Sequence, residues 1–194
     1  MSTTPPNSSS KLSAQTRISD QPISDQIKLP HSDLLHEMNI TGPDILRRKE
    51  WLEFTEDDVR NLGELNDIAQ GYADELIKLL NNHFKKFGES SEIFDNPDVL
   101  NRVKILQKEY FLRLTQGNYD SKYIEERLNV GSVHAHIGLD VKWYLGAYNF
   151  YIQSVGKKIF EAFKDKPGKI QDLFLSLIKL VFMDIGLAID TYIF

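Results

Sequence analysis

One histidine in this sequence stands between two glycines at helical spacing. Gly131 lies three residues before His134, and Gly138 lies four residues after it. On an α-helix, at about 100° per residue, all three fall on one face, so the imidazole would project from a strip without bulky side chains. Axial ligation of haem iron requires such a strip, because the helix backbone must come close to the porphyrin plane. His134 is therefore a candidate iron ligand.

Other interpretations of the histidines stay open at this point. A lone histidine on an apolar helix is more often a satisfied core residue than a metal ligand. His136 follows His134 by two residues, about 200° round a helix, so the two rings cannot reach one iron from the same side. We expect His136 at the surface or at an interface, and we assign no role to His31 and His36.

The composition limits the kinds of binding partner and of catalytic or metal site that we expect for this chain. The 194 residues carry a formal net charge of −5, which gives no general attraction to nucleic acid or to an anionic membrane. With no cysteine, the chain has no disulfide, no thiolate nucleophile and no cysteine-based metal site, as is usual in the cytoplasm. Acidic pairs such as Asp57–Asp58 are typical of solvated helix surfaces. We expect a cytoplasmic protein that is not an enzyme and has neither nucleic-acid nor membrane partners.

The chain divides into a leader and one domain. Residues 1–40 are rich in Ser, Thr, Pro, Asp and Gln and lack the basic and apolar regions of a signal peptide, so we expect a disordered leader. Residues 41–194 have helical patterns without a convincing strand, which predicts an all-α domain. The expected helices cover residues 45–54, residues 55–87 with a break near Gly71, a stretch from Asn96–Pro97, and residues 121–139, 140–164 and 170–194.

The last helix is apolar around most of its circumference. The run from Leu173 to Met183 has more apolar side chains than the stripe, roughly 100° wide, with which a helix packs on a single core. A central helix of the monomer is one explanation. A membrane span is another, although Lys179, Asp184 and Asp190 interrupt the apolar run. The interpretation we favour is a homodimer in which the last two helices of each chain form a four-helix bundle.

The region around His134 also carries a family resemblance. The sequences His134-Ala-His-Ile-Gly-Leu139 and Lys142-Trp-Tyr-Leu-Gly-Ala-Tyr148 resemble the proximal haem region of the globin-coupled sensors. The resemblance is weaker in residues 96–100, 106–107 and 123–127, and it extends over residues 45–194. It implies a globin fold with an extra N-terminal helix and two long last helices. It also implies that haem b binds a diatomic gas, usually O2, and that a homodimer signals to an output module absent from this chain.

The resemblance further implies roles for individual residues. Tyr144 matches a tyrosine near the proximal ligand that would tune the iron, although packing between helices explains it equally well. In many members a tyrosine donates a hydrogen bond to bound oxygen, and our register puts Phe84 at that position. Loss of this hydroxyl weakens oxygen capture, by roughly tenfold to a hundredfold, unless another donor replaces it. Gln107, Tyr110 and His83 are the candidate replacements.

Three further expectations concern the pocket walls and the rival functions. Val103 and Leu106 are the residues of their helix that we expect to face the pocket, which would make it largely apolar and suited to NO or CO. Arg127 lies two turns before His134 and meets either a haem propionate or a neighbouring carboxylate. The rival functions are a haem-free globin-fold module of stress signalling, and a globin that acts as a peroxidase or nitric-oxide dioxygenase.

Overall fold

Helices make up all the regular structure that the computed structural model describes, which covers residues 33–87 and 96–194. This confirms the expected all-α class, and no strand occurs within those residues. The helices are α2 (Leu34–Glu37), α3 (Gly42–Trp51), α4 (Glu56–Glu64), α5 (Asn66–Phe84), α7 (Pro97–Arg113), α8 (Ser121–His136), α9 (Val141–Ala162) and α10 (Pro167–Ile193).

Capping side chains fix most of the helix starts. The Asn96 side chain accepts hydrogen bonds from two backbone N–H groups at the start of α7, and Pro97 follows at the first helical position. Asp120 and Asp140 accept from the first turns of α8 and α9 in the same way. These helices therefore begin where the sequence predicts. The break expected after Phe87 lies at residues 88–91, outside the described residues.

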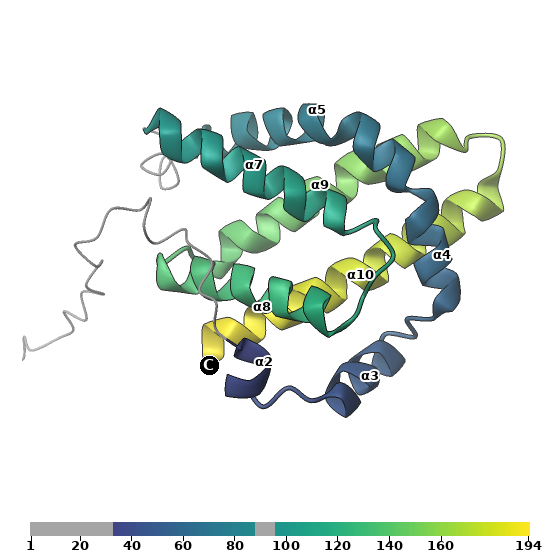
Figure 1. The fold of residues 1–194 in the computed structure, drawn as a ribbon. Coiled ribbons are helices and arrows are strands. Elements are labelled where there is room, and N and C mark those ends of the chain that lie inside the picture. The colour runs from purple at the N-terminus through teal and green to yellow at the C-terminus, as the bar shows by residue number, and fades with distance from the viewer. Residues whose placement is uncertain (1–32, 88–95) are drawn as a thin grey trace, which may run out of the picture.

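Two expected boundaries are wrong. The long helix breaks at Leu65 and not near Gly71, because α4 docks on α10 through Asp58 and Ser176 while α5 turns away to pack on α7 and α9 (Figure 1). The leader ends before residue 40, because the N–H groups of Leu34 and Leu35 donate to the Glu125 carboxylate of α8 at 2.7 and 2.9 Å. Residues 1–32 of the expected leader lie outside the described residues.

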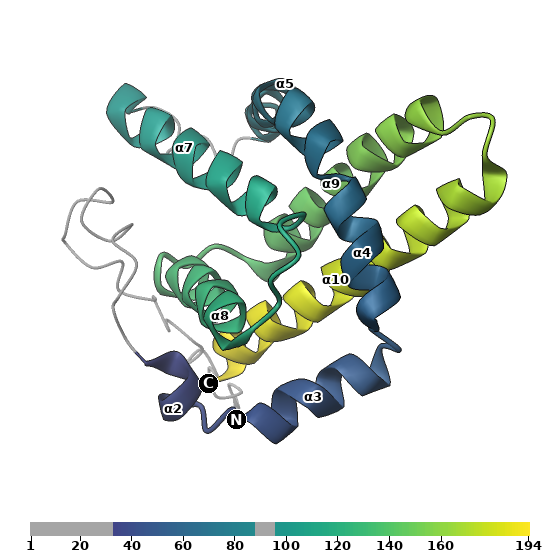
Figure 2. The same ribbon diagram turned by 45° about the vertical axis from the view of Figure 1, so that its right-hand side comes forward.

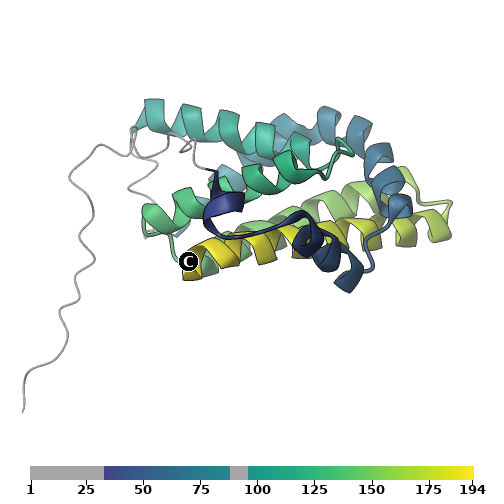
Figure 3. The same ribbon diagram turned by 60° about the horizontal axis from the view of Figure 1, so that its bottom comes forward.

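The centre of the fold is α10, which packs against α4, α8 and α9 (Figure 2). Figure 3 shows α9 and α10 side by side, with α5 and α7 in a separate layer above them. In this arrangement α7 packs on α5, and α8 packs on α10. The segments that carry the candidate site residues, α5, α7, α8 and α9, thus surround one region of the interior.

Most of the apolar side chains in the excess on α10 are buried inside the monomer. Leu173, Leu177 and Leu180 are fully buried, so the central-helix explanation accounts for the greater part of the apolar run. Leu175 and Phe182, one heptad apart, remain about half exposed. No helix in the described part of the chain is long and apolar enough to cross a membrane.

Candidate functional site

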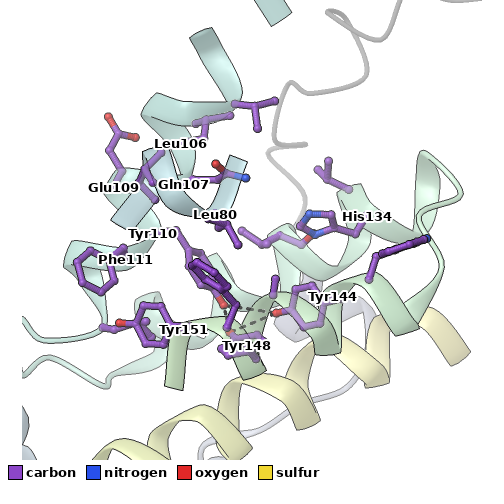
Figure 4. Close-up of a pocket in the computed structure, with 18 of the residues that line it drawn as sticks. Leu80, Leu106, Gln107, Glu109, Tyr110, Phe111, His134, Tyr144, Tyr148 and Tyr151 are labelled. Carbon is purple, nitrogen blue, oxygen red and sulfur yellow. Dashed lines mark hydrogen bonds between the residues drawn. The ribbon is translucent and has the colours of Figure 1, made fainter. Parts of the chain in front are cut away.

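A cavity of about 490 Å³ lies between α5, α7, α8 and α9 (Figure 4). This volume is within the range of cofactor and ligand pockets, roughly 300–1,000 Å³. Most of the lining is apolar. The apolar lining residues are Leu76, Ile77, Leu80, Phe84, Val103, Leu106, Phe111, Leu114, Val130, Val133, Ile137, Leu139, Trp143, Ala147 and Phe150.

His134 lines this cavity from α8, and its protonation is set by the helix backbone. Its Nδ1 lies 2.8 Å from the carbonyl oxygen of Val130. A carbonyl only accepts, so Nδ1 carries the proton and donates it, which leaves the lone pair on Nε2. Burial lowers the pKa of His134, although the bond to Val130 opposes this shift, so the ring is neutral at pH 7. A neutral imidazole with a free Nε2 is the form that ligates a metal.

Gly138 has a different role from the one we expected. It lies beyond the end of α8 with φ of +70°, a left-handed conformation that favours glycine. The N–H of Leu139 donates to the carbonyl of His134 at 2.9 Å, and the N–H of Gly138 donates to that of Ala135 at 3.1 Å. These two bonds form a Schellman motif, which ends the helix. Gly138 therefore does not share a helical face with His134, but its turn brings Leu139 back to the pocket.

Gly131 also does not face the cavity. A Cβ added at Gly131 would lie 2.4 Å from Oγ1 of Thr191 and 2.8 Å from Cα of Ala188. Both of these residues belong to α10. Gly131 is thus required where α8 crosses α10, and the expected strip of glycines along the cofactor is wrong because the backbone faces another helix there. Neither glycine lines the cavity.

Tyr144 of α9 packs against the imidazole. The two ring centres lie 5.3 Å apart at an interplanar angle of 59°. The Tyr144 hydroxyl lies 3.4 Å from the hydroxyls of Tyr110 and Tyr148, and so points away from His134 into a group of tyrosines (Figure 4). The structure therefore places Tyr144 beside the candidate ligand, in ring contact and without a hydrogen bond to it.

A buried carboxylate lies behind these tyrosines, and no sequence pattern predicted its place in the site. Asp184 of α10 is fully buried and accepts hydrogen bonds from Tyr123 at 2.8 and 3.0 Å, from Tyr148 at 3.2 Å and from Tyr110 at 3.3 Å. Burial raises its pKa to about 6, and Arg127 and the hydroxyls oppose this shift. Its signal in the sequence is a carboxylate amid the apolar run of the last helix.

Arg127 belongs to this buried group as well. Its Nη1 lies 3.7 Å from Oδ2 of Asp184, and its Cζ lies 3.7 Å from the ring centre of Tyr110. Burial alone would lower its pKa, but the surrounding tyrosines and Asp184 raise it above the usual range, so the guanidinium stays charged. Arg127 meets Asp184 of α10 and also Glu126 of its own helix, whose Oε2 lies 3.9 Å from Nη2 of Arg127. Arg127 also lines the cavity, and its contact with a haem propionate stays a prediction.

The opposite wall, formed by α5 and α7, carries few polar groups. Phe84, Val103 and Leu106 line the cavity there, as does Leu80, one turn before Phe84. His83 is not among the lining residues; its ring packs on Phe87 and Phe150. The side chain of Gln107 reaches the cavity from α7, and its Oε1 accepts a hydrogen bond from Asn81 of α5 at 2.8 Å. No pattern in the sequence pointed to Asn81.

The described residues do not group three His, Cys, Asp or Glu side chains as a metal site. A metal that takes its other ligands from a cofactor needs only one imidazole from the protein. Haem fits this requirement, because its porphyrin supplies four nitrogen ligands and needs apolar walls and one axial imidazole. The observed donor set and the apolar cavity thus suit haem.

Comparisons with known proteins agree with this geometry. A family model described as Protoglobin matches residues 42–193. The chain is similar to the haem-based aerotactic transducer HemAT of Halobacterium salinarum, with 26% identity over 180 residues, which are 88% of this chain and 35% of that protein. The chain thus spans about a third of that relative's length.

A solved structure shows the same architecture. The globin domain of the Geobacter sulfurreducens globin-coupled sensor superposes with a TM-score of 0.72 at 22% sequence identity, over 76% of this chain and 96% of that domain. At this identity the likeness concerns the fold alone. It confirms that the helices described above form a globin fold of the sensor type.

Proposed function

We propose that this chain, which belongs to the protoglobin family, holds haem b through His134 and senses a diatomic gas. The observation that carries the proposal is the orientation of His134, whose Nδ1–H is fixed by Val130 while Nε2 is left for a metal. Haem supplies the iron at which O2, NO or CO binds. Because the sequence has no cysteine, no thioether attachment is possible, which favours b-type haem.

The sensing part of the proposal is supported by the relatives. One of them is described as an aerotactic transducer and the other as the globin domain of a sensor. Both descriptions concern signalling and not catalysis. We propose the same for this chain, with O2 as the first candidate and NO or CO as alternatives, and with an output module on another polypeptide or segment. We also propose that it acts in the cytoplasm and that the globin domain spans residues 41–194, with α2 packed onto it.

The signal would leave the pocket through α8 and α9. The Schellman turn at Gly138 joins the His134 segment directly to α9, and Gly131 places α8 in backbone contact with α10. A small shift of α8 therefore acts on both long helices, because a packed crossing cannot deform continuously.

We propose that these helices pair in a homodimer. A stripe along α10 with a/d spacing stays partly or largely exposed, at Leu175, Ile178, Phe182, Ile185 and Ile189. Phe160 of α9 is exposed beside Phe174 of α10, with ring centres 6.2 Å apart. The variant Phe182→Glu is expected to convert the dimer to a monomer in light-scattering measurements. A monomeric wild-type chain contradicts the proposal.

A visible spectrum tests the haem proposal. The purified protein, supplied with hemin, is expected to give a Soret band with one haem per chain. His134→Ala should lose or strongly weaken this band, because no other imidazole lines the described cavity. His136→Ala is the matched control, since this exposed residue lies only two positions away and outside the cavity. A wild-type protein without pigment, or an unchanged band in His134→Ala, contradicts the proposal.

A further inference from the structure

We propose that Gln107 is the hydrogen-bond donor to the gas ligand and that Asn81 is the positioning residue that directs its amide. This inference rests on the proposed function, since the ligand binds opposite His134. In our register Phe84 stands where many globin-coupled sensors have the donor tyrosine. A pair of amide side chains from two helices, Gln107 of α7 and Asn81 of α5, would take over the role of that hydroxyl. The orientations of the two amides decide which of their atoms can donate to a ligand.

The orientation of Asn81 follows from the chemistry of its neighbours. Its Nδ2 lies 2.8 Å from the backbone carbonyl of Ile77 and 2.8 Å from Oε1 of Gln107. A backbone carbonyl has no hydrogen to donate, so the Asn81 atom beside it must be the nitrogen. Both hydrogens of that nitrogen are then used, one for each partner.

The orientation of Gln107 follows from that of Asn81. The nitrogen of Asn81 can only donate, so the Gln107 atom that faces it must be the oxygen. The Nε2 of Gln107 is therefore turned the other way, and it donates to no other group among the described residues. Figure 4 shows this nitrogen on the side of the Gln107 amide nearer to His134. The donor is thus pre-oriented before a ligand arrives.

Stability does not explain why an asparagine is buried here. Asn81 is 2% exposed, and its Oδ1 has no hydrogen-bond partner in the described structure. A buried polar atom without a partner destabilises a fold, so an apolar residue would suit this place on α5 better. The hydrogen bond that Asn81 makes across to α7 is its distinctive contribution.

The other polar groups at the cavity are engaged or turned away. The Tyr110 hydroxyl contacts those of Tyr144 and Tyr148 and donates to Asp184. The Tyr151 hydroxyl is buried without a partner, but Figure 4 shows it directed away from His134. Arg113 also lines the cavity from α7, but its guanidinium donates to Glu126 and Gln116. Gln107 is left as the group on the α5–α7 wall whose donor has no partner among the described residues.

Ligand dissociation from the reduced holoprotein tests the donor. Gln107→Leu is expected to raise the O2 dissociation rate by roughly tenfold or more, because a hydrogen bond to the polar ligand is lost. Gln107→Glu, measured at pH 8, should do the same, since a carboxylate keeps an acceptor for Asn81 and has no hydrogen to donate. The control Asn101→Leu makes a similar change on the exposed side of α7 and should leave the rate within twofold.

The stretching frequency of added carbon monoxide tests the positioning. The wild-type protein is expected to give one band, and Gln107→Leu one band at higher frequency, because a donor near the ligand oxygen lowers this frequency. Asn81→Leu frees the Gln107 amide to rotate, so two bands should appear, one for each orientation. A purely structural role of Asn81 would shift stability without splitting the band.

The outcomes separate the two proposals. A protein that takes up no haem, or that keeps haem in His134→Ala, overturns the proposed function and this inference together. The inference alone is overturned if the protein holds haem through His134 but neither Gln107 variant changes the O2 dissociation rate or the carbon monoxide band. A single unshifted band in Asn81→Leu overturns the positioning role and leaves Gln107 as the donor.

Discussion

The two walls of the cavity are built on different principles. The wall of α8 and α9, backed by α10, contains His134 and a buried group of tyrosines around Asp184 and Arg127. The wall of α5 and α7 is mostly apolar, and Tyr110 of α7 belongs to the group around Asp184. The other polar lining residues of this wall are Glu109, Arg113 and Gln107, and Gln107 is held by Asn81. A dense polar network has few alternative arrangements, whereas an apolar wall tolerates rearrangement of side chains. We infer that the first wall sets the position of His134 and the second sets the choice of ligand.

The largest effect is expected from breaking the network at its centre. Asp184→Ala leaves the Arg127 guanidinium charged, buried and without its carboxylate, which costs about 3–5 kcal/mol of the free energy of unfolding. Urea denaturation of the haem-free protein measures this loss. Asp172→Ala, an exposed aspartate on the same helix, is the control and should change stability by less than about 0.5 kcal/mol. A similar stability of the two variants would contradict the role given to the network.

The next effect concerns the contact that joins this wall to α10. Gly131→Ala forces its new Cβ into Thr191 and the backbone of Ala188, and should cost roughly 1–3 kcal/mol of the free energy of unfolding. Gly186→Ala is the matched control, because its Cβ meets nothing within 4 Å and alanine stabilises a helix by roughly 0.5–1 kcal/mol. Thermal unfolding of both variants measures the difference. If Gly131→Ala is as stable as Gly186→Ala, the close crossing of α8 and α10 is wrong.

A smaller effect should appear as a pH dependence of stability. The pKa of Asp184 is raised to about 6 by burial, from an ordinary value of 3.8. Between those values the folded protein holds a proton that the unfolded chain releases, so this residue makes the fold more stable as the pH falls from 6 towards 4. The slope is roughly 1.4 kcal/mol per pH unit, and it disappears above pH 6, where both states are ionised.

The comparison with Asp184→Asn isolates this slope. Other carboxylates have the opposite dependence; for Asp58, burial alone would raise the pKa, but hydrogen bonds from Thr55 and Ser176 lower it below its ordinary value. These groups titrate equally in both proteins and cancel in the difference. Urea denaturation at several pH values should therefore show that the free energy of unfolding of the wild type rises relative to that of the variant as the pH falls from 6 towards 4. If the free energies of unfolding of the two proteins change in parallel with pH, the raised pKa of Asp184 is wrong.

The smallest effect on stability is expected at the α5–α7 wall. The double variant Asn81→Leu with Gln107→Leu removes both partners of one hydrogen bond together with the unpaired Oδ1, so stability should change by no more than about 1 kcal/mol. Chemical denaturation of the haem-free variant measures this. A loss as large as that of Asp184→Ala would show that the two walls do not differ in the way we infer.

Much of the fold could be predicted from local sequence. Asn96, Asp120 and Asp140 fix the starts of three helices through bonds within one turn, and such short-range signals are visible in the sequence. The break at Leu65 was not predicted, because it depends on the docking of α4 against α10 and not on the residues beside it. The placement of residues 33–40 on Glu125 was missed for the same reason.

For the site, the sequence by itself determined the candidate ligand, its helix and the apolar character of the pocket, because residue type and helical period carry that information. Only the tertiary structure decided which residues of other helices contact the residues of the site. It turned Gly131 towards α10, placed Gly138 beyond the end of the helix, and joined Arg127 to Asp184 across 57 positions of the chain. Asn81 meets Gln107 across two helices in the same way. Such contacts depend on where helices cross, which packing of the whole core sets and no local pattern encodes.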